Sequence, residues 1–458
     1  MTFDRRQVLD FAAKTALAIS AVPRFALAQA ATDVRDIPDI PGLARDMYIF
    51  TFPLYEFYRL RSVGVISGLG SQPARINQFQ HSRELIDHTY RIVPSPNNDT
   101  LFSSAFLDLS RGPLILEVPK ISNRYYSLAF MDSYTNNFAY VGTRATGTGA
   151  GKYLIAGPDW TGSARPGEQV ISSPTNAVWL LGRILITGAD DLPRVHELQD
   201  LLKLHPAPET EAPLPFDGPP IVADDRWNYF AVVNHALTQN PPRRNEAAVI
   251  TRMNAINVGP GQKFDPAKIS EAERNAVLSG IEIAKRLIST NNPSDKVVNG
   301  WRYPVPGIGN FGTNYLQRAA TARSGLGALE SEEAMYLGYV GEPLEGSRSY
   351  RLRFESDKFP PVNAFWSITM YEVMPDGRRF FTDNPIKRYS IGDRTPGLSR
   401  SADGSLEIYI QREAPSGGRE TNWLPTPAGR FSMTLRAYLP KQEHLEHRYA
   451  PPSLTRLN

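Results

Sequence analysis

Hydrophobic and polar positions along the chain follow two different periods. Over residues 101–186, short apolar, aromatic and β-branched segments are separated by Gly, Pro, Asn and Asp at intervals typical of a sandwich or barrel. Over residues 225–288, apolar residues recur every three or four positions, which predicts helices. Over residues 350–439, apolar and polar residues alternate again, as they do in half-buried strands. The pattern predicts two β modules with a helical segment between them.

These elements place the chain in the α+β class, rich in β structure, with two sandwich-like or jelly-roll β modules. An apolar helix over 43–63 precedes the first module, a helix over 192–204 follows it, and a Pro-rich linker covers 206–220. Ser270 and Glu273 provide an N-terminal cap for the third middle helix. The expected divisions are 1–30 (export signal), 31–200 (N-terminal β-rich domain with its leading helix), 201–345 (linker and helical region) and 346–458 (C-terminal β-sandwich domain).

The N-terminus has the features of a twin-arginine export signal. Arg5 and Arg6 precede a Gln and two apolar residues, a weakly apolar stretch covers 11–22, and residues 28–30 (Ala-Gln-Ala) fit a small-x-small cleavage site. The stretch is too short and too polar to cross a bilayer, so we expect no stable membrane span in the mature chain. An uncleaved amphipathic helix is the alternative. The signal predicts a periplasmic protein that meets the export machinery after folding, a route compatible with a homo-oligomer.

Composition narrows the classes of partner and chemistry. The 458 residues carry a net charge of +3, with 41% hydrophobic and 21% charged residues, close to an ordinary soluble protein. No run of Lys or Arg exceeds two residues, so nucleic acid is not an expected partner. Cysteine is absent, which excludes disulfides, cysteine nucleophiles, zinc–thiolate sites and ordinary iron–sulfur ligation. We expect no cofactor.

One glycine-rich motif resembles a nucleotide site but lacks its context. Gly307, Gly309 and Gly312 satisfy the pattern G-x-G-x-x-G. That pattern binds a dinucleotide where a strand precedes it and a helix follows, and residues 303–306 (Tyr-Pro-Val-Pro) are poor strand material. We interpret the motif as a loop that caps a helix over 314–323.

The histidines form no metal-binding motif of the type His-x-His or His-Glu-x-x-His. His444 and His447 could share one helical face, but their charged neighbours favour a solvated surface. His81 and His88 could share a helix face with the acidic residues between them, and a metal site there is the less favoured interpretation. We therefore predict no bound transition metal.

Two stretches of the chain hold more polar and aromatic side chains than turns require. In the first, we expect Asn97 and Asp99 to point into a cleft, Asp99 as a catalytic carboxylate and Asn97 as a substrate-binding amide. The alternative is an Asx turn that enters the strand at Leu101.

The second stretch supplies Tyr126, Asp132, Tyr134, Asn136 and Arg144. If its strands pair as hairpins, a phenol, a carboxylate and a guanidinium lie at neighbouring strand ends, where they can perform acid–base work or bind an anion. We assign Tyr126 and Asp132 to catalysis, and Tyr134, Asn136 and Arg144 to substrate binding. A buried salt bridge that ties the strands together is the alternative.

The C-terminal half adds aromatic and cationic side chains. We expect Trp366, Arg388 and Trp423 to form a wall that faces the ligand. Core packing is the alternative explanation for these residues.

Several motifs resemble a bacterial pair of domains of unknown function. The segments 97–100, 124–160 and 182–193 resemble the domain numbered 1254, and the segments 360–367, 384–393, 403–406 and 422–425 resemble its usual partner, numbered 1214. The similarity covers nearly all of the chain after the signal, in the usual order. It implies a β-rich N-terminal domain, a helical region and a C-terminal β-sandwich of jelly-roll character. It implies no established reaction, cofactor or catalytic residue.

Two functions fit these features. The leading hypothesis is an exported protein that binds a small organic molecule and transforms it, by hydrolysis for example. The alternative is a non-catalytic jelly-roll module that serves binding or assembly in the cell envelope. Convergence of Asp99, Asp132 and Arg144 in one cleft would favour the enzyme. Salt bridges that tie these residues separately would favour the module.

Overall fold

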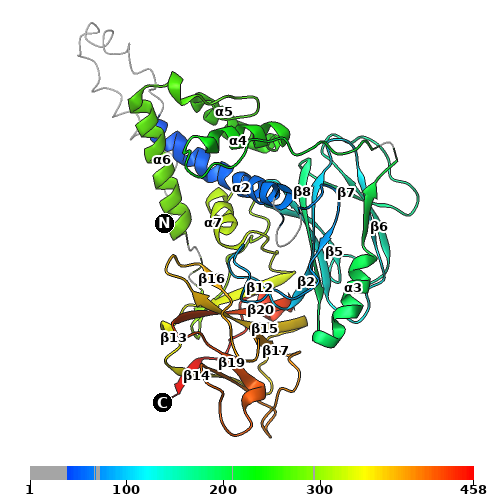
Figure 1. Ribbon diagram of the computed structural model, residues 1–458, viewed down its shortest axis with the longest axis vertical. Coiled ribbons are helices and arrows are strands. Elements are labelled where there is room, and N and C mark those ends of the chain that lie inside the picture. The colour runs from blue at the N-terminus through cyan, green and yellow to red at the C-terminus, as the bar shows by residue number, and fades with distance from the viewer. Residues whose placement is uncertain are drawn as a thin grey trace, which may run out of the picture. The chain divides into compact units, whose positions relative to one another are not determined.

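The computed structural model describes residues 39–66, 68, 73–208, 210–291, 294 and 296–457 (Figure 1). Within these residues, 21 strands and seven α-helices form a β-rich α+β structure, which confirms the predicted class. None of the helices described is both long and apolar enough to cross a bilayer. The predicted export signal lies outside the described residues.

The N-terminal sandwich packs two sheets face to face. Leu128 and Ile184 of the larger sheet share one buried core with Leu114 and Tyr153 of the smaller. The larger sheet is antiparallel, in the order β1 (Gln80–His81), β2 (Thr100–Asp108), β8 (Ala177–Leu185), β4 (Tyr126–Asp132) and β5 (Asn137–Gly142). The smaller sheet has the order β7 (Gln169–Ser172), β6 (Gly151–Ala156), β3 (Leu114–Val118) and β9 (Lys203–Pro206). Strands β1 and β9 are therefore edge strands.

The central strands β4 and β8 are buried along their whole length. One face of each strand packs on the sandwich core. On the opposite face, Phe57 and Leu60 of α2 (Ile40–Ile66) contact Met131 and Trp179. Burial on both faces explains why these two strands appear in the sequence as apolar runs rather than as an alternating pattern.

The helical segment packs on α2. The rings of Tyr48 in α2 and Tyr229 in α4 stack, with 4.7 Å between their centroids. Gly280 of α6 meets the carbonyl oxygen of Pro41 so closely that any Cβ would clash, so glycine permits this approach of the two helices. In Figure 1 the green helices α4, α5 and α6 lie beside the blue α2. The helices after α2 are α3 (Leu192–Asp200), α4 (Asn228–Gln239), α5 (Ala247–Met253), α6 (Glu271–Thr290), α7 (Tyr315–Gly325) and α8 (Gln442–Leu445).

The C-terminal sandwich repeats the face-to-face arrangement. Its core combines Leu337 and Ile368 of the larger sheet with Leu352 and Ile408 of the smaller. The larger sheet has the order β10 (Val297–Val298), β11 (Trp301–Arg302), β12 (Ala334–Tyr339), β20 (Arg430–Pro440), β15 (Val362–Val373) and β16 (Arg379–Phe380), with β13 (Leu344–Glu345) on β20 and β17 (Ser390–Gly392) on β15. The smaller sheet has the order β19 (Trp423–Pro425), β18 (Leu406–Gln411), β14 (Ser349–Phe354) and β21 (Leu454–Leu457).

Two local predictions are confirmed by hydrogen bonds. The Ser270 side chain accepts from the Glu273 backbone and the Glu273 side chain accepts from the Ser270 backbone, which completes a capping box at the start of α6. Asn314 caps α7 after the glycine-rich loop, as expected for a loop rather than a nucleotide site.

Three local predictions are wrong. The helix predicted over 192–204 ends at Asp200, because the chain turns there and pairs with β3 as β9. His81 lies in strand β1 rather than on a helix. His444 is fully buried rather than solvated, because its ring packs between Tyr303 and Tyr449, and burial lowers its pKa to about 4, which keeps it neutral. Within the described part of the chain, no group of three or more His, Asp or Glu side chains could hold a metal ion.

Candidate functional site

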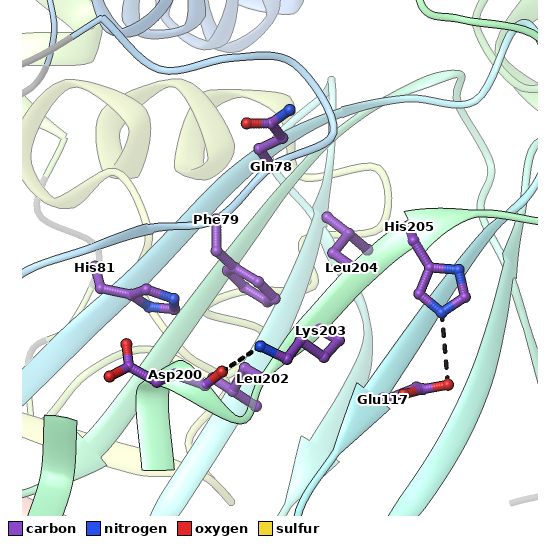
Figure 2. A pocket seen from close by; sticks show the side chains of 9 residues that line it. All are labelled: Gln78, Phe79, His81, Glu117, Asp200, Leu202, Lys203, Leu204 and His205. Carbon is purple, nitrogen blue, oxygen red and sulfur yellow. Dashed lines mark hydrogen bonds and ion pairs between the residues drawn. The ribbon is translucent and has the colours of Figure 1, made fainter. Parts of the chain in front are cut away.

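A pocket of about 440 Å³ lies at the edge of the N-terminal sandwich, where β1 and β9 meet (Figure 2). Its walls come from the segment around β1, from β9 with the residues before it, and from β3. The lining residues are Gln78, Phe79, His81, Glu117, Asp200, Leu202, Lys203, Leu204 and His205. The pocket therefore joins both sheets of one sandwich, through segments about 120 residues apart in the sequence.

Three of the nine lining residues give the pocket an apolar patch. Leu202 belongs to the core of the sandwich, and Phe79 and Leu204 pack against that core. The Phe79 ring stacks on the His81 ring with 5.4 Å between centroids and 21° between planes. The pocket thus offers a flat aromatic surface next to aliphatic side chains.

A chain of buried polar contacts links His81 to Gln199. The side-chain nitrogen of Gln199 donates to the carbonyl oxygens of Ser82 and Phe102 at 3.1 and 3.0 Å, which assigns the orientation of that amide. The same nitrogen lies 3.3 Å from Ser103 Oγ, and Ser103 Oγ lies 2.9 Å from Nδ1 of His81. When the Ser103 hydroxyl donates to Nδ1, the neutral ring carries its proton on Nε2.

His81 remains neutral at physiological pH. Burial, together with the nearby positive charge of Arg83, lowers the pKa of His81 to about 4. Within the described part of the chain, Nε2 of His81 has no hydrogen-bond partner, and the residue lines the pocket. In the tautomer with its proton on Nε2, His81 presents one uncharged N–H donor to the pocket.

The charged groups at the rim are engaged with one another. Lys203 Nζ donates to the Asp200 carbonyl oxygen at 2.6 Å, and Arg83 pairs with the Asp200 carboxylate. His205 lies between two acceptors, with Nε2 3.5 Å from Glu117 Oε1 and Nδ1 3.2 Å from the carbonyl oxygen of Pro206. A neutral ring can donate to only one of these two acceptors at a time.

The first predicted pair, Asn97 and Asp99, lies where the two sandwiches touch. Asn97 Oδ1 accepts from the Asp99 backbone at 2.7 Å, which forms an Asx turn, and Asn97 Nδ2 donates to Tyr438. Asp99 Oδ2 accepts from Ser367 Oγ at 2.8 Å, and Asp99 Oδ1 lies 3.8 Å from Arg394. Both side chains thus connect the start of β2 to the C-terminal sandwich.

Asp132, Tyr134 and Asn136 occupy the turn after β4. Asp132 Oδ1 accepts from the backbone nitrogens of Tyr134 and Asn136 at 3.0 and 2.9 Å, and Oδ2 lies 3.1 Å from Arg243. Tyr134 donates its hydroxyl proton to the carbonyl oxygen of Asn240 at 2.7 Å. Burial raises the pKa of the Asp132 carboxyl, and the backbone donors and Arg243 oppose that rise.

Tyr126 and Arg144 also have internal partners. The Tyr126 hydroxyl donates to the Gly147 carbonyl oxygen at 3.1 Å, and burial raises the pKa of this phenol. Arg144 Nε lies 2.6 Å from Glu333 Oε2, and Glu333 is buried.

The three C-terminal candidates stabilise the second sandwich. Trp366 packs in its core, 4.8 Å from the Phe354 ring. Arg388 donates to the carbonyl oxygen of Trp423 at 2.8 Å, and Trp423 Nε1 donates to the Gln411 carbonyl oxygen at the same distance.

The structure does not bring Asp99, Asp132 and Arg144 into one pocket. The register explains this: Thr100, next to Asp99, pairs with Leu185 at one end of β8, whereas Asp132 pairs with Val178 at the other end. The seven residue steps along β8 from Val178 to Leu185 correspond to roughly 23 Å. Arg144 follows β5 and pairs with Glu333 instead.

Sequence reasoning missed the residues that line the pocket in Figure 2. His81 sits in a strand of two residues, and β9 was predicted as the end of a helix. The sequence carries no short motif that joins them. Two edge strands that meet could have indicated the site. Recognising them requires the pairing partner of each strand, and the sequence does not give these partners.

Comparisons with known proteins place the pocket within one family match. Residues 76–206 match the model of a protein family of unknown function (DUF1254), and residues 334–442 match a second such model (DUF1214). All nine lining residues fall within the first match. No curated protein matches the chain.

Two solved structures are similar to the chain. The VPA0106 protein from Vibrio parahaemolyticus is 24% identical, with a TM-score of 0.69 over 92% of this chain and 100% of that one, which supports the fold. An uncharacterised protein from Burkholderia cenocepacia is 12% identical, with a TM-score of 0.45 over 99% of this chain and 94% of that one.

Proposed function

We propose that the protein binds a small organic molecule in the pocket between β1 and β9 and leaves it chemically unchanged. The chain belongs to the family that joins DUF1254 to DUF1214. The observation that carries this proposal is the position of His81, whose Nδ1 contacts Ser103 and whose ring lies beside the apolar side chains of the pocket. We assign the ring proton to Nε2, with the Ser103 hydroxyl donating to Nδ1. Ligand sites in proteins combine such apolar surfaces with a few oriented polar groups.

The composition of the pocket supports binding over hydrolysis. None of its nine lining residues carries a hydroxyl or thiol nucleophile. The predicted catalytic residues Tyr126, Asp99 and Asp132 all have structural partners elsewhere. These contacts favour the non-catalytic alternative over a hydrolase.

The class of ligand can be inferred from the hydrogen-bond donor and the apolar side chains of the pocket. An oxygen acceptor, such as a carbonyl, ether or hydroxyl oxygen, would receive the His81 proton. A planar or aliphatic body would cover Phe79, Leu202 and Leu204. The rim charges are paired with one another, so the ligand needs no charge of its own.

A matched pair of His81 variants tests this site. In His81→Phe the ring remains and the donor is lost, so ligands selected from a library of neutral small molecules should bind about 3–10-fold more weakly. In His81→Gln the amide nitrogen can replace Nε2, so affinity should stay close to that of the native protein. His81 is neutral above its pKa of about 4. In a His205→Gln protein, where His81 is the one histidine among the nine lining residues, affinity should therefore be constant between about pH 5.5 and pH 8.

Calorimetric titration measures these affinities, and thermal unfolding of the same samples checks that the variants fold. Equal affinity in native protein and His81→Phe would contradict the proposal. So would an affinity of the His205→Gln protein that changes across this pH range with the titration of one histidine.

We further propose that the protein acts in the periplasm after twin-arginine export. The double substitution Arg5→Lys with Arg6→Lys should abolish its appearance in the periplasmic fraction, because the export receptor reads the arginine pair. Arg24→Lys, outside the pair, is the control and should leave export intact. Fractionation followed by immunoblotting measures the outcome, and unchanged localisation of the double variant would show that another route is used.

A further inference from the structure

A second cavity, of about 470 Å³, lies in the C-terminal half of the chain. Two motifs from the sequence meet there: Gly307 and Asn310 of the glycine-rich loop line one side, and His447 lines another. Glu330 and Glu332, between α7 and β12, complete the polar part. The cavity shares no lining residue with the pocket of Figure 2.

Half of the twelve residues that line this cavity are apolar. The apolar lining residues are Pro304, Val305, Pro306, Ile308, Met335 and Leu445. A cavity of this size and lining suits an organic ligand rather than a hydrated inorganic ion.

The glycine-rich loop is held in place independently of any ligand. Gly307 and Gly309 have φ angles of 82° and 84°, which glycine adopts without strain. The Gly309 carbonyl oxygen accepts from the Asn137 backbone at 2.6 Å, and a Cβ on Gly309 would lie 2.8 Å from the Glu330 backbone nitrogen. The loop is therefore packed tightly between β5 and the segment that carries Glu330, and the cavity is preformed.

The charge of the lining is negative. Glu330 and Glu332 are its charged carboxylates, and no Lys or Arg is among the twelve lining residues. Burial raises the pKa of the Glu330 carboxyl, and the neighbouring charge of Glu332 adds to the rise. Glu330 is half-buried and accepts from the Asn310 side chain, whereas Glu332 is exposed. Two carboxylates without a lining Lys or Arg disfavour a phosphate on the glycine-rich loop.

Cations close to the cavity do not remove this imbalance. Arg144 offsets part of the Glu330 charge, but its guanidinium is bound to Glu333 at 2.6 Å. Burial and the charge of Lys296 together lower the pKa of His447 and keep its ring neutral.

We propose that this cavity binds an organic ammonium ion, with its charged nitrogen at Glu330 and Glu332 and its hydrocarbon part against Ile308, Met335 and Leu445. The ammonium group pairs with the two carboxylates, and the apolar residues of the lining contact the hydrocarbon part. This site is independent of the pocket at His81.

The test compares a cation with a neutral molecule of the same shape. Hexylammonium and hexanol serve as probes, and calorimetry measures both on the full chain. The native protein should bind hexylammonium at least about tenfold more tightly than hexanol, because hydrogen bonds to charged groups are the stronger kind. The double variant Glu330→Gln with Glu332→Gln should lose that preference, whereas Glu342→Gln, an exposed residue outside the cavity, should keep it.

A second readout locates the ligand. The methyl resonance of Met335 should shift when hexylammonium is added and should not shift in the double variant. Equal affinity for the two probes, absence of binding by the folded native protein, or an unchanged preference in the double variant would each overturn the proposal. None of these outcomes bears on the His81 pocket.

Discussion

Replacing Asp132 by Ala should lower the free energy of unfolding by about 3–5 kcal/mol, because its removal leaves buried partners without compensation. Asp132 is fully buried, accepts two backbone hydrogen bonds from Tyr134 and Asn136, and lies 3.1 Å from Arg243. Its charge also compensates the buried guanidinium of Arg318, whose pKa is lowered mainly by burial. Urea unfolding followed by circular dichroism measures the change.

A matched control separates this structural role from a catalytic one. Asp159→Ala removes an exposed carboxylate from the same sandwich and should change stability by less than about 0.5 kcal/mol. Below its own unfolding temperature, the Asp132→Ala protein should still bind the ligands of the His81 pocket. A variant of native stability that has lost binding would instead show that Asp132 is a site residue, as the sequence pattern suggested.

Replacing Arg436 by Met should cost about 2–5 kcal/mol, because several buried acceptors lose their donor at once. Arg436 donates to the carbonyl oxygens of Ser95 and Pro96 at 3.1 and 3.3 Å and to the Tyr371 hydroxyl at 2.6 Å. Its side chain lies in the larger sheet of the C-terminal sandwich, whereas Ser95 and Pro96 belong to the loop before β2. The loss should therefore weaken the contact between the two sandwiches.

Arg430→Met on the same strand is the control for this second effect. Arg430 is exposed, so its substitution should leave stability within about 0.5 kcal/mol of the native value. Limited proteolysis should cut Arg436→Met faster than the control in the segments that join the sandwiches. Equal unfolding curves for the two variants would mean that the Arg436 hydrogen bonds are replaced by water at no cost.

Local pattern was sufficient to predict most of the fold. Strand β14 alternates strictly, with Tyr350, Leu352 and Phe354 buried and the residues between them more exposed, and this period is visible in the sequence. The cap at Ser270 also depends on neighbours within one turn of helix. Such features depend on a few adjacent residues, so a single sequence contains them.

The site depends on pairing between distant segments and could not be predicted in the same way. Strand β1 pairs with β2, and β9 pairs with β3, and only these registers bring His81 near Lys203. The site also requires that Gln199 and Ser103 are both buried next to His81, because their contacts orient the His81 ring. The grouping of Asp99 with Asp132 failed for the related reason that they lie at opposite ends of one sheet.

Histidine resonances of the full chain, labelled with nitrogen-15, test the central claim most directly. The account predicts that His81 carries its proton on Nε2, titrates near the pKa of about 4, and shifts its Nε2 resonance when a ligand of the pocket is added. Ser103→Ala should remove the preference for this tautomer. Titration of His81 at the ordinary pKa of about 6.5 would contradict the account. So would an Nε2 resonance of His81 that does not shift with any ligand the protein binds.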